Sequence, residues 1–221
     1  LWAISDLPLA SGINRAALAA LPHYGEDWLI LAGDVAERSE HVHFAFQTLT
    51  ERFAKVIWTP GNHDLWTVND DPEFGGLAGP AKYAALVDLA RSYGVLTPAD
   101  DWPVWVGPGG PCTIASLFTL YDYSFRPPGV TRADVVAWAK EGRAACADEM
   151  YLNPTPFASR EAWCKALCAD AEARLEALDP LLLTILVNHY PLRQDLVRMR
   201  RIPRFSPWCG TTATSDWPAR F

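Results

Sequence analysis

Short apolar runs alternate with amphipathic stretches through the first sixty or so positions of the chain. The segments "LWAIS", "DWLILAGD" and "KVIWTPGNHD" each carry the near-continuous apolar run of a buried strand. Between them, "NRAALAALP" and "EHVHFAFQTLTERFA" place apolar residues at helical spacing, and the first helix is predicted to end at Pro22. This β-α-β-α-β order predicts a parallel sheet that is covered on both faces.

This alternation of apolar runs and amphipathic stretches is less regular from Thr67 to about Gly129 and becomes clear again after it. We expect a loop in "DDPEFGGLAGP", a helix in "AKYAALVDLARSYG" and a hairpin-like pair of strands in "GPGGPCTIASLFTLYDYSF". A helix in "EAWCKALCADAEARLEALDP" is predicted to end at Pro180, and "LLLTILVNHYPL" reads as another buried strand. Because no internal repeat or long linker interrupts these elements, residues 1–221 are predicted to form a single domain.

Composition narrows the class of protein. Half of the 221 residues are hydrophobic and ten are Trp, which is ample for a substantial core. The formal charge of −7 argues against a nucleic-acid-binding protein, which needs a basic face. No stretch of eighteen or more apolar residues occurs, so no membrane-spanning segment is predicted. Five irregularly spaced cysteines do not form a disulfide framework, and reduced thiols in a cytoplasmic protein are the simpler interpretation.

Both ends of the sequence look truncated. It begins at Leu1, inside a strand-like run, and it stops at Phe221, after the turn-rich segment "CGTTATSDWPARF". We therefore expect the chain to be incomplete at its N- and C-termini.

Polar side chains follow four of the predicted strands where each strand ends. They are Asp6, Asp34, the run Asn62-His63-Asp64, and the pair Asn188-His189. Ligand sites in open α/β sheets lie at the carboxyl ends of the strands, so these residues are expected to lie together. Carboxylate, amide and imidazole donors form a mixed oxygen and nitrogen shell that suits Mn, Fe or Zn. Two such metals could clamp a phosphate oxygen and lower the pKa of a water between them.

The series "SDL", "LAGDVAE", "PGNHDLW" and "LVNHYPL", in this order, resembles the calcineurin-like metallophosphoesterases. Their pattern is D-x-H, G-D-x-x, G-N-H-[E/D], a further His and finally G-H-x-H. The segments "DWLILAGDVAE", "RFAKVIWTPGNHDLWT", "LYDYSF" and "WCGTT" are also similar to an actinobacterial branch that includes a hydrolase removing phosphopantetheine from acyl carrier protein. The likeness covers nearly all of the chain.

The resemblance implies a fold and a role for each matching residue. The fold would be an α/β protein, a four-layer α/β/β/α metallophosphoesterase sandwich that is incomplete at its C-terminal end. Asp6 would bind the first metal, Asp34 would bridge both, and Asn62 and His189 would bind the second. His63 would be the catalytic histidine that assists the leaving group, and Asp64 would orient it.

The sequence departs from the family pattern at three points. Pro8 stands where D-x-H has its histidine, and a proline side chain has no ligand atom. No G-H-x-H segment occurs within the 221 residues, and Pro218 lies where close relatives are expected to carry a histidine. The family binds two divalent metals, whereas one or two are expected here, because three ligands with an open position can hold a single metal.

The motifs and the departures from them leave two possible functions, that of an enzyme and that of a binding protein. The first is divalent-metal-dependent hydrolysis of a phosphate ester, with the phosphopantetheine linkage of acyl carrier protein as the expected substrate. The alternative is a catalytically impaired relative that binds a phosphate ligand or a protein partner without turnover; Pro8 and the missing histidines favour it, and the intact G-N-H-D motif opposes it. A third possibility is a fragment with an unpaired strand edge and exposed apolar surface. The oligomeric state is left open.

Several of these residues also have simpler interpretations. Asp34 could cap the following helix, a role compatible with metal binding, and His189 could be a core histidine.

An unusual arginine cluster stands out in this acidic chain, and it comprises Arg193, Arg198, Arg200, Arg201 and Arg204. It is either a solvated charged face or a docking site for an acidic partner or a nucleotide phosphate tail.

Overall fold

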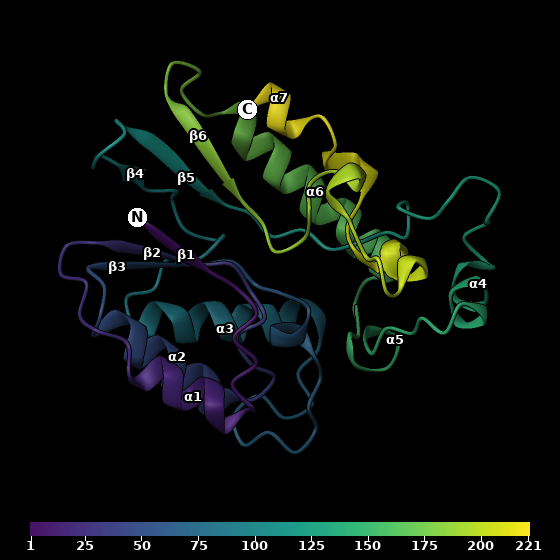
Figure 1. Cartoon of the computed structure of the whole chain (residues 1–221), viewed down its shortest axis with the longest axis horizontal. Helices are drawn as coiled ribbons and strands as arrows, with labels where there is room; N and C mark the ends of the chain where they lie inside the picture. The colour runs from purple at the N-terminus through teal and green to yellow at the C-terminus, as the bar shows by residue number, and fades with distance from the viewer.

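The computed structural model describes residues 1–221 and contains two three-stranded sheets (Figure 1). The first sheet is parallel, with the order β1 (Trp2–Ile4), β2 (Trp28–Leu31) and β3 (Lys55–Trp58). Its connecting helices are α1 (Gly12–Ala19) and α2 (Ser39–Thr50). Because each strand is added on the same side of the previous one, right-handed crossovers place both helices on one face. The predicted β-α-β-α-β unit is therefore present.

The second sheet has the order β4 (Val104–Trp105), β5 (Cys112–Ser116) and β6 (Leu183–Val187). Strands β4 and β5 are antiparallel, whereas β5 and β6 are parallel. The hairpin predicted within residues 107–125 is thus shifted, because "GPGGP" forms the turn between the strands and "LFTLYDYSF" contains no strand. Glycine and proline favour turns over strand interiors, which explains why the first strand ends before Gly107.

The remaining helices differ in how far the sequence predicted them. The predicted helices over residues 81–94 and 161–180 correspond to α3 (Gly79–Ser92) and α6 (Arg160–Glu176). The short helices were not predicted, and they are α4 (Val135–Glu141), α5 (Asp148–Tyr151) and α7 (Trp217–Arg220). Four 3₁₀ turns complete the structure: His63–Leu65, Gln194–Leu196, Pro203–Trp208 and Thr212–Thr214.

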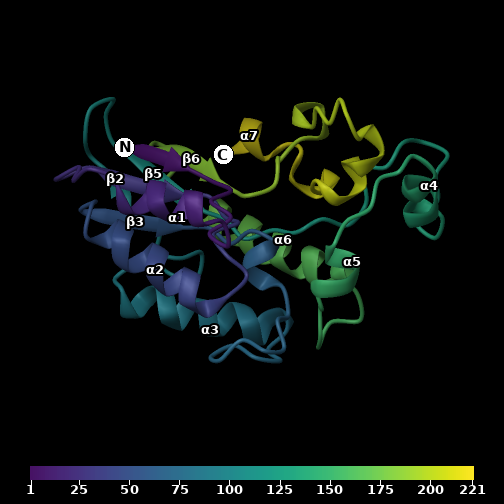
Figure 2. The same cartoon turned by 60° about the horizontal axis from the view of Figure 1, so that its bottom comes forward.

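The two sheets pack against each other through a small apolar core. Ile30 and Ile57 of the first sheet pack with Ile114 and Val187 of the second. Figures 1 and 2 place α1, α2 and α3 on one side of the first sheet, and Figure 1 shows α6 and α7 beside the second sheet. The order of layers is therefore helix, sheet, sheet and helix, as the four-layer α/β/β/α prediction requires.

Strands β1 and β6 are edge strands rather than the buried strands that the sequence predicted. Strand β1 pairs only with β2, and β6 pairs only with β5. Half of the Trp2 surface and 76% of the Leu183 surface are exposed. An unpaired edge leaves backbone N–H and C=O groups without ladder partners. Apolar side chains on and beside these two strands are also exposed, and they are Leu1, Trp2, Ile4, Leu181, Leu183 and Ile185.

The structure also shows whether any helix could cross a membrane and whether the cysteines are paired. No helix combines the length and the apolar character that a membrane crossing requires. All five cysteines are free thiols, and three of them are buried.

Candidate metal centre

The residues that follow the parallel strands meet in one cavity at the carboxyl edge of the sheets. Asp6 follows β1, Asp34 follows β2, Asn62 and His63 follow β3, and His189 follows β6. All five line a cavity of about 370 Å³. The sequence-based expectation that these strand ends lie together matches the structure, because parallel strands bring their carboxyl ends to one edge.

Three of these side chains form a compact set of possible metal ligands. Asp6, Asp34 and His189 each offer one ligand atom, and these atoms lie within 4.8 Å of one another. His189 Nε2 is 3.5 Å from Asp34 Oδ2, so the imidazole and the carboxylate face the same point. Two carboxylates and one imidazole suit Mn, Fe or Zn, and the residues present therefore fit a divalent ion.

The backbone fixes which nitrogen of His189 faces the site. The Nδ1 atom lies 3.0 Å from the carbonyl oxygen of Ala32 and donates to it, which leaves Nε2 directed towards Asp34. Burial lowers the pKa of His189, but the hydrogen bond and the charge of Asp34 outweigh burial and raise it to about 9. Without a cation the two side chains form an ion pair, and a cation would take the place of that proton.

The backbone at this edge of the sheet also has unusual conformations and close approaches. Asp6 and Asp34 have φ values of 55° and 53°, a left-handed conformation that is costly for residues other than glycine and that concentrates at functional sites. Two glycines allow the loops to approach closely. A Cβ atom on Gly61 would lie 2.1 Å from Asp34 Oδ1, and one on Gly33 would lie 2.7 Å from His189 Nδ1. Neither position has room for a side chain.

Asn62 is held by an aspartate that the sequence reasoning missed. Its Nδ2 donates to Asp148 Oδ1 at 2.8 Å, and Trp66 Nε1 donates to the same oxygen at 2.6 Å. Asp148 is only 1% exposed, and its backbone carbonyl accepts from Arg160 Nη2 at 2.9 Å. Because the amide nitrogen is engaged, the side-chain oxygen of Asn62 is the atom free to ligate a cation. No local motif marks Asp148, which lies 86 residues further along the chain.

His63 is held by Glu37, a second residue to which the sequence reasoning gave no role. His63 Nδ1 lies 2.9 Å from Glu37 Oε1, and the imidazole stacks on Trp66 with ring centroids 3.7 Å apart. Burial lowers the pKa of His63, but the hydrogen bond to Glu37 and the charge of Asp34 outweigh it, so the pKa is raised. The ring lines the cavity, with Nε2 4.0 Å from Asp34 Oδ2. This arrangement suits a proton donor.

The carboxylate of Asp64 contacts backbone N–H groups and not the His63 ring that it was expected to orient. Its buried carboxylate accepts four backbone N–H groups, from Asp34 at 3.1 Å, Val35 at 2.8 Å, Ala36 at 3.1 Å and Gly61 at 2.9 Å. Burial and the nearby Asp34 carboxylate raise the pKa of Asp64 to about 6. Asp64 therefore joins the loop after β2 to the loop after β3, and Glu37 is the residue that contacts His63.

Neither anomalous proline lies in the cavity. Pro8 is exposed, and its carbonyl oxygen accepts from the backbone of Ser11 at 3.0 Å, one residue before α1. Pro218 is the second residue of α7 and is also exposed. In this chain the position of the D-x-H histidine therefore supplies no side-chain ligand.

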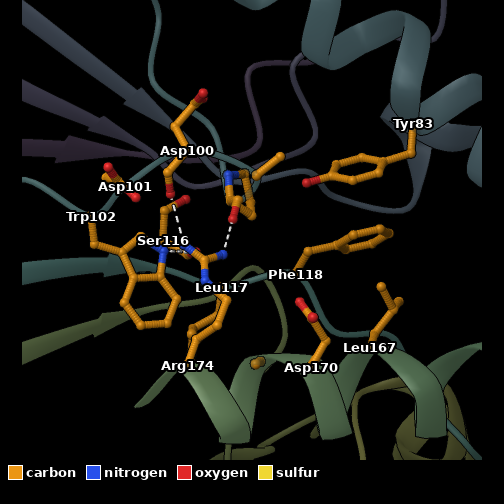
Figure 3. Close-up of a pocket in the computed structure, with 13 residues that line it drawn as sticks. Tyr83, Asp100, Asp101, Trp102, Ser116, Leu117, Phe118, Leu167, Asp170 and Arg174 are labelled. Atoms are coloured by element: carbon orange, nitrogen blue, oxygen red, sulfur yellow. Dashed lines mark hydrogen bonds between the residues drawn. The ribbon is translucent and has the colours of Figure 1, made fainter. Parts of the chain in front are cut away.

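A second cavity, of about 350 Å³, lies between α3 and α6 (Figure 3). Its single arginine, Arg174, lies over the Trp102 ring at 4.2 Å and donates to the carbonyl oxygens of Pro98 and Asp100. These contacts engage the cation within the fold. None of the strand-end residues lines this cavity, so the chemistry belongs to the first one.

Comparison with known proteins is consistent with this geometry. The calcineurin-like phosphoesterase family matches residues 1–195. Over 223 aligned residues, the chain is 48% identical to the [acyl-carrier-protein] phosphodiesterase PptH of Mycobacterium tuberculosis, covering all of this chain and 68% of that protein. The crystal structure of phosphopantetheinyl hydrolase (PptH) from the same organism matches with a TM-score of 0.92 and 47% identity, covering 99% of this chain and 78% of that one. The chain therefore belongs to the calcineurin-like phosphoesterase family and is a metal-dependent phosphoester hydrolase.

Proposed function

We propose that this protein hydrolyses the phosphodiester that joins phosphopantetheine to acyl carrier protein. The observation that carries the proposal is the identity of 48% to an acyl-carrier-protein phosphodiesterase across the whole chain. Similarity at this level extends through the elements that build the cavity. It therefore concerns the walls of the site as well as the strand-end residues.

Four side chains are proposed as metal ligands, and they are Asp6, Asp34, Asn62 and His189. Divalent ions, of which Mn, Fe and Zn suit these donors, would polarise the phosphoryl oxygen and lower the pKa of the attacking water. The protein holds its donors in place before any ion arrives. Ala32 fixes the ring of His189, and Asp148 fixes the amide of Asn62.

His63 is proposed as the proton donor to the leaving oxygen. Its Nδ1 is engaged by Glu37, so Nε2 is the nitrogen available to the substrate. The raised pKa favours the protonated imidazole, which is the form that a general acid requires. Asp64 is proposed to hold the two loops in position and to take no part in the proton transfer to the leaving oxygen.

The rest of the cavity wall suits the remainder of this substrate. Val197, Met199, Phe205 and Trp208 line it beside the polar donors. A phosphopantetheine arm combines one phosphate with a long chain of methylenes and amides. The cavity thus offers a polar end for the phosphate and an apolar wall for the arm.

A second candidate function is supported by Pro8. If His189 serves the second metal, as the family pattern implies, the first metal has only Asp6 and Asp34, because position 8 carries no histidine. Two carboxylates alone hold a transition metal weakly. A protein in that state would bind the phosphate ester without turning it over. The same experiment separates the two functions.

The test uses a carrier protein that bears phosphopantetheine, incubated with the purified hydrolase and Mn²⁺. Intact-mass spectrometry of the carrier protein should record loss of the whole phosphopantetheine group, and the Asp34→Asn variant should leave the mass unchanged. A carrier protein that binds but keeps its prosthetic group would support the second candidate. A carrier protein that neither binds nor loses the group would refute both.

A further inference from the structure

A short basic segment borders the candidate metal centre. Residues 193–204 contain five arginines and a single acidic residue, Asp195, although the whole chain carries a formal charge of −7. Arg198 itself lines the cavity that holds Asp34 and His189. The basic segment that the sequence left without a location therefore reaches the wall of the candidate metal centre through Arg198.

Two of the five arginines are engaged within the fold. Arg193 forms a two-pronged ion pair with Asp195, with N–O distances of 2.9 and 3.0 Å. Arg204 donates to the Trp138 carbonyl oxygen at 2.6 Å and lies 3.2 Å from Glu141. The other three are exposed and form no ion pair or side-chain hydrogen bond, and they are Arg198, Arg200 and Arg201.

The segment is tied down at both ends. Gln194 Nε2 and Ser206 Oγ both donate to the carbonyl oxygen of Phe125, at 3.0 and 3.1 Å. Trp208, just beyond, is buried, and its Nε1 donates to Glu149 at 2.8 Å. One acceptor therefore joins two points that are twelve residues apart, and the chain between them is presented as a defined loop. We call residues 195–205 the basic loop.

The basic loop also exposes apolar side chains between its charges. Leu196 is 60% exposed and Ile202 is 38% exposed. Free cations beside exposed aliphatic residues match the features of a protein-binding surface, in which charge steers the encounter and apolar contacts stabilise the complex. A site for a small phosphate alone would need no exposed leucine or isoleucine.

We propose that the basic loop is the docking surface for an acidic face of the protein substrate. Arg198, Arg200 and Arg201 pair with its carboxylates, and Leu196 and Ile202 contact the apolar side chains between them. Docking at this position directs the phosphodiester of the substrate into the adjacent cavity. This inference rests on the proposed function, because it needs a phosphoester that is carried by a protein.

The test compares two substrates and two charge-reversal variants. The substrates are an acyl carrier protein bearing phosphopantetheine and the small diester bis-p-nitrophenyl phosphate. The variants are the double variant Arg200→Glu/Arg201→Glu and, as the control, Lys165→Glu, an exposed lysine on α6 that forms no ion pair and lies outside the cavity. In the double variant, the ratio of kcat/KM for the carrier protein to kcat/KM for the diester should fall about tenfold or more. In the control variant this ratio should stay near the wild-type value.

Salt provides a second readout. For the wild-type protein, KM for the carrier protein should rise as NaCl increases from about 0.05 to about 0.3 M, because screening weakens exposed charge pairs. The double variant should show a flatter dependence. A merely structural role of the two arginines would leave the salt dependence of KM unaltered.

The outcomes separate the two proposals. If the wild type cleaves the carrier protein and the double variant does so with the same ratio and salt dependence, the docking surface is refuted and the proposed function stands. If the wild type hydrolyses only the diester, both fail. If a nucleotide polyphosphate loses affinity in the double variant while the carrier protein does not, the loop binds nucleotides and the proposal is overturned.

Discussion

Asp148 accepts a hydrogen bond from the side-chain amide of Asn62 at 2.8 Å, and this contact determines which atom of Asn62 faces the cavity. The Asp148→Ala variant should lower metal affinity by about 10- to 100-fold, because the amide would be free to turn its nitrogen towards the cation. Asp148→Asn, which keeps an acceptor oxygen, should lose less. Calorimetric titration with Mn²⁺ measures both effects, and the exposed Asp101→Ala variant is the control. Equal affinity in all three variants would remove Asp148 from the site.

Glu37 should influence the reaction without influencing metal binding. Removing its charge in Glu37→Gln lowers the pKa of His63, so fewer molecules carry the proton that the leaving oxygen needs. We expect kcat for bis-p-nitrophenyl phosphate to fall about tenfold or more near neutral pH, with metal content unaltered. The exposed Glu26→Gln variant should behave as the wild type. Loss of metal from Glu37→Gln would instead identify Glu37 as a ligand.

Asp64 should matter chiefly for stability. Asp64→Ala leaves four backbone N–H groups without their acceptor, and we expect the free energy of unfolding to fall by about 2 to 4 kcal/mol. Urea denaturation followed by circular dichroism measures this loss, and Asp88→Ala, on the exposed face of α3, serves as the control. Normal stability combined with lost turnover would return Asp64 to a catalytic role.

Pro8 offers a test of the first metal position. Pro8→His restores the family's D-x-H spacing and should raise the number of metal ions bound per chain, together with turnover of the small diester. Pro8→Ala removes the ring without adding a ligand, and it should leave metal content as it is. Elemental mass spectrometry on the purified variants gives the comparison. Identical metal content in Pro8→His and Pro8→Ala would count against placing the first metal beside Asp6.

The sequence predicted the scaffold of the site well because hydrophobic periodicity and strand-end chemistry are local signals. Asp6, Asp34 and His189 each follow an apolar run, and parallel pairing brings such positions to one edge. Strand burial was predicted less well. Leu183 lies in an apolar run, but its exposure depends on whether a neighbour covers the strand, and periodicity does not carry that information.

The residues that hold the candidate ligands in place could not be predicted from local sequence patterns. Glu37 lies within a quoted motif, yet only the folded loop shows that it contacts His63 across 26 positions. Asp148 belongs to a four-residue helix that no pattern predicted, and its partner Asn62 is 86 positions away. Long-range contacts of single polar side chains leave no periodic trace in one sequence. The location of the basic loop depends on tertiary structure for the same reason.

Together, the strand-end residues should form a working metal-dependent phosphoesterase. The most direct measurement is metal content by elemental mass spectrometry, combined with turnover of bis-p-nitrophenyl phosphate with and without added Mn²⁺, on the wild type and on Asp34→Asn. We predict about one or two metal ions per chain and Mn²⁺-dependent turnover in the wild type, with both strongly reduced in the variant. A wild-type protein that retains no metal and shows no turnover with added Mn²⁺ would show that these residues do not form a working metal centre.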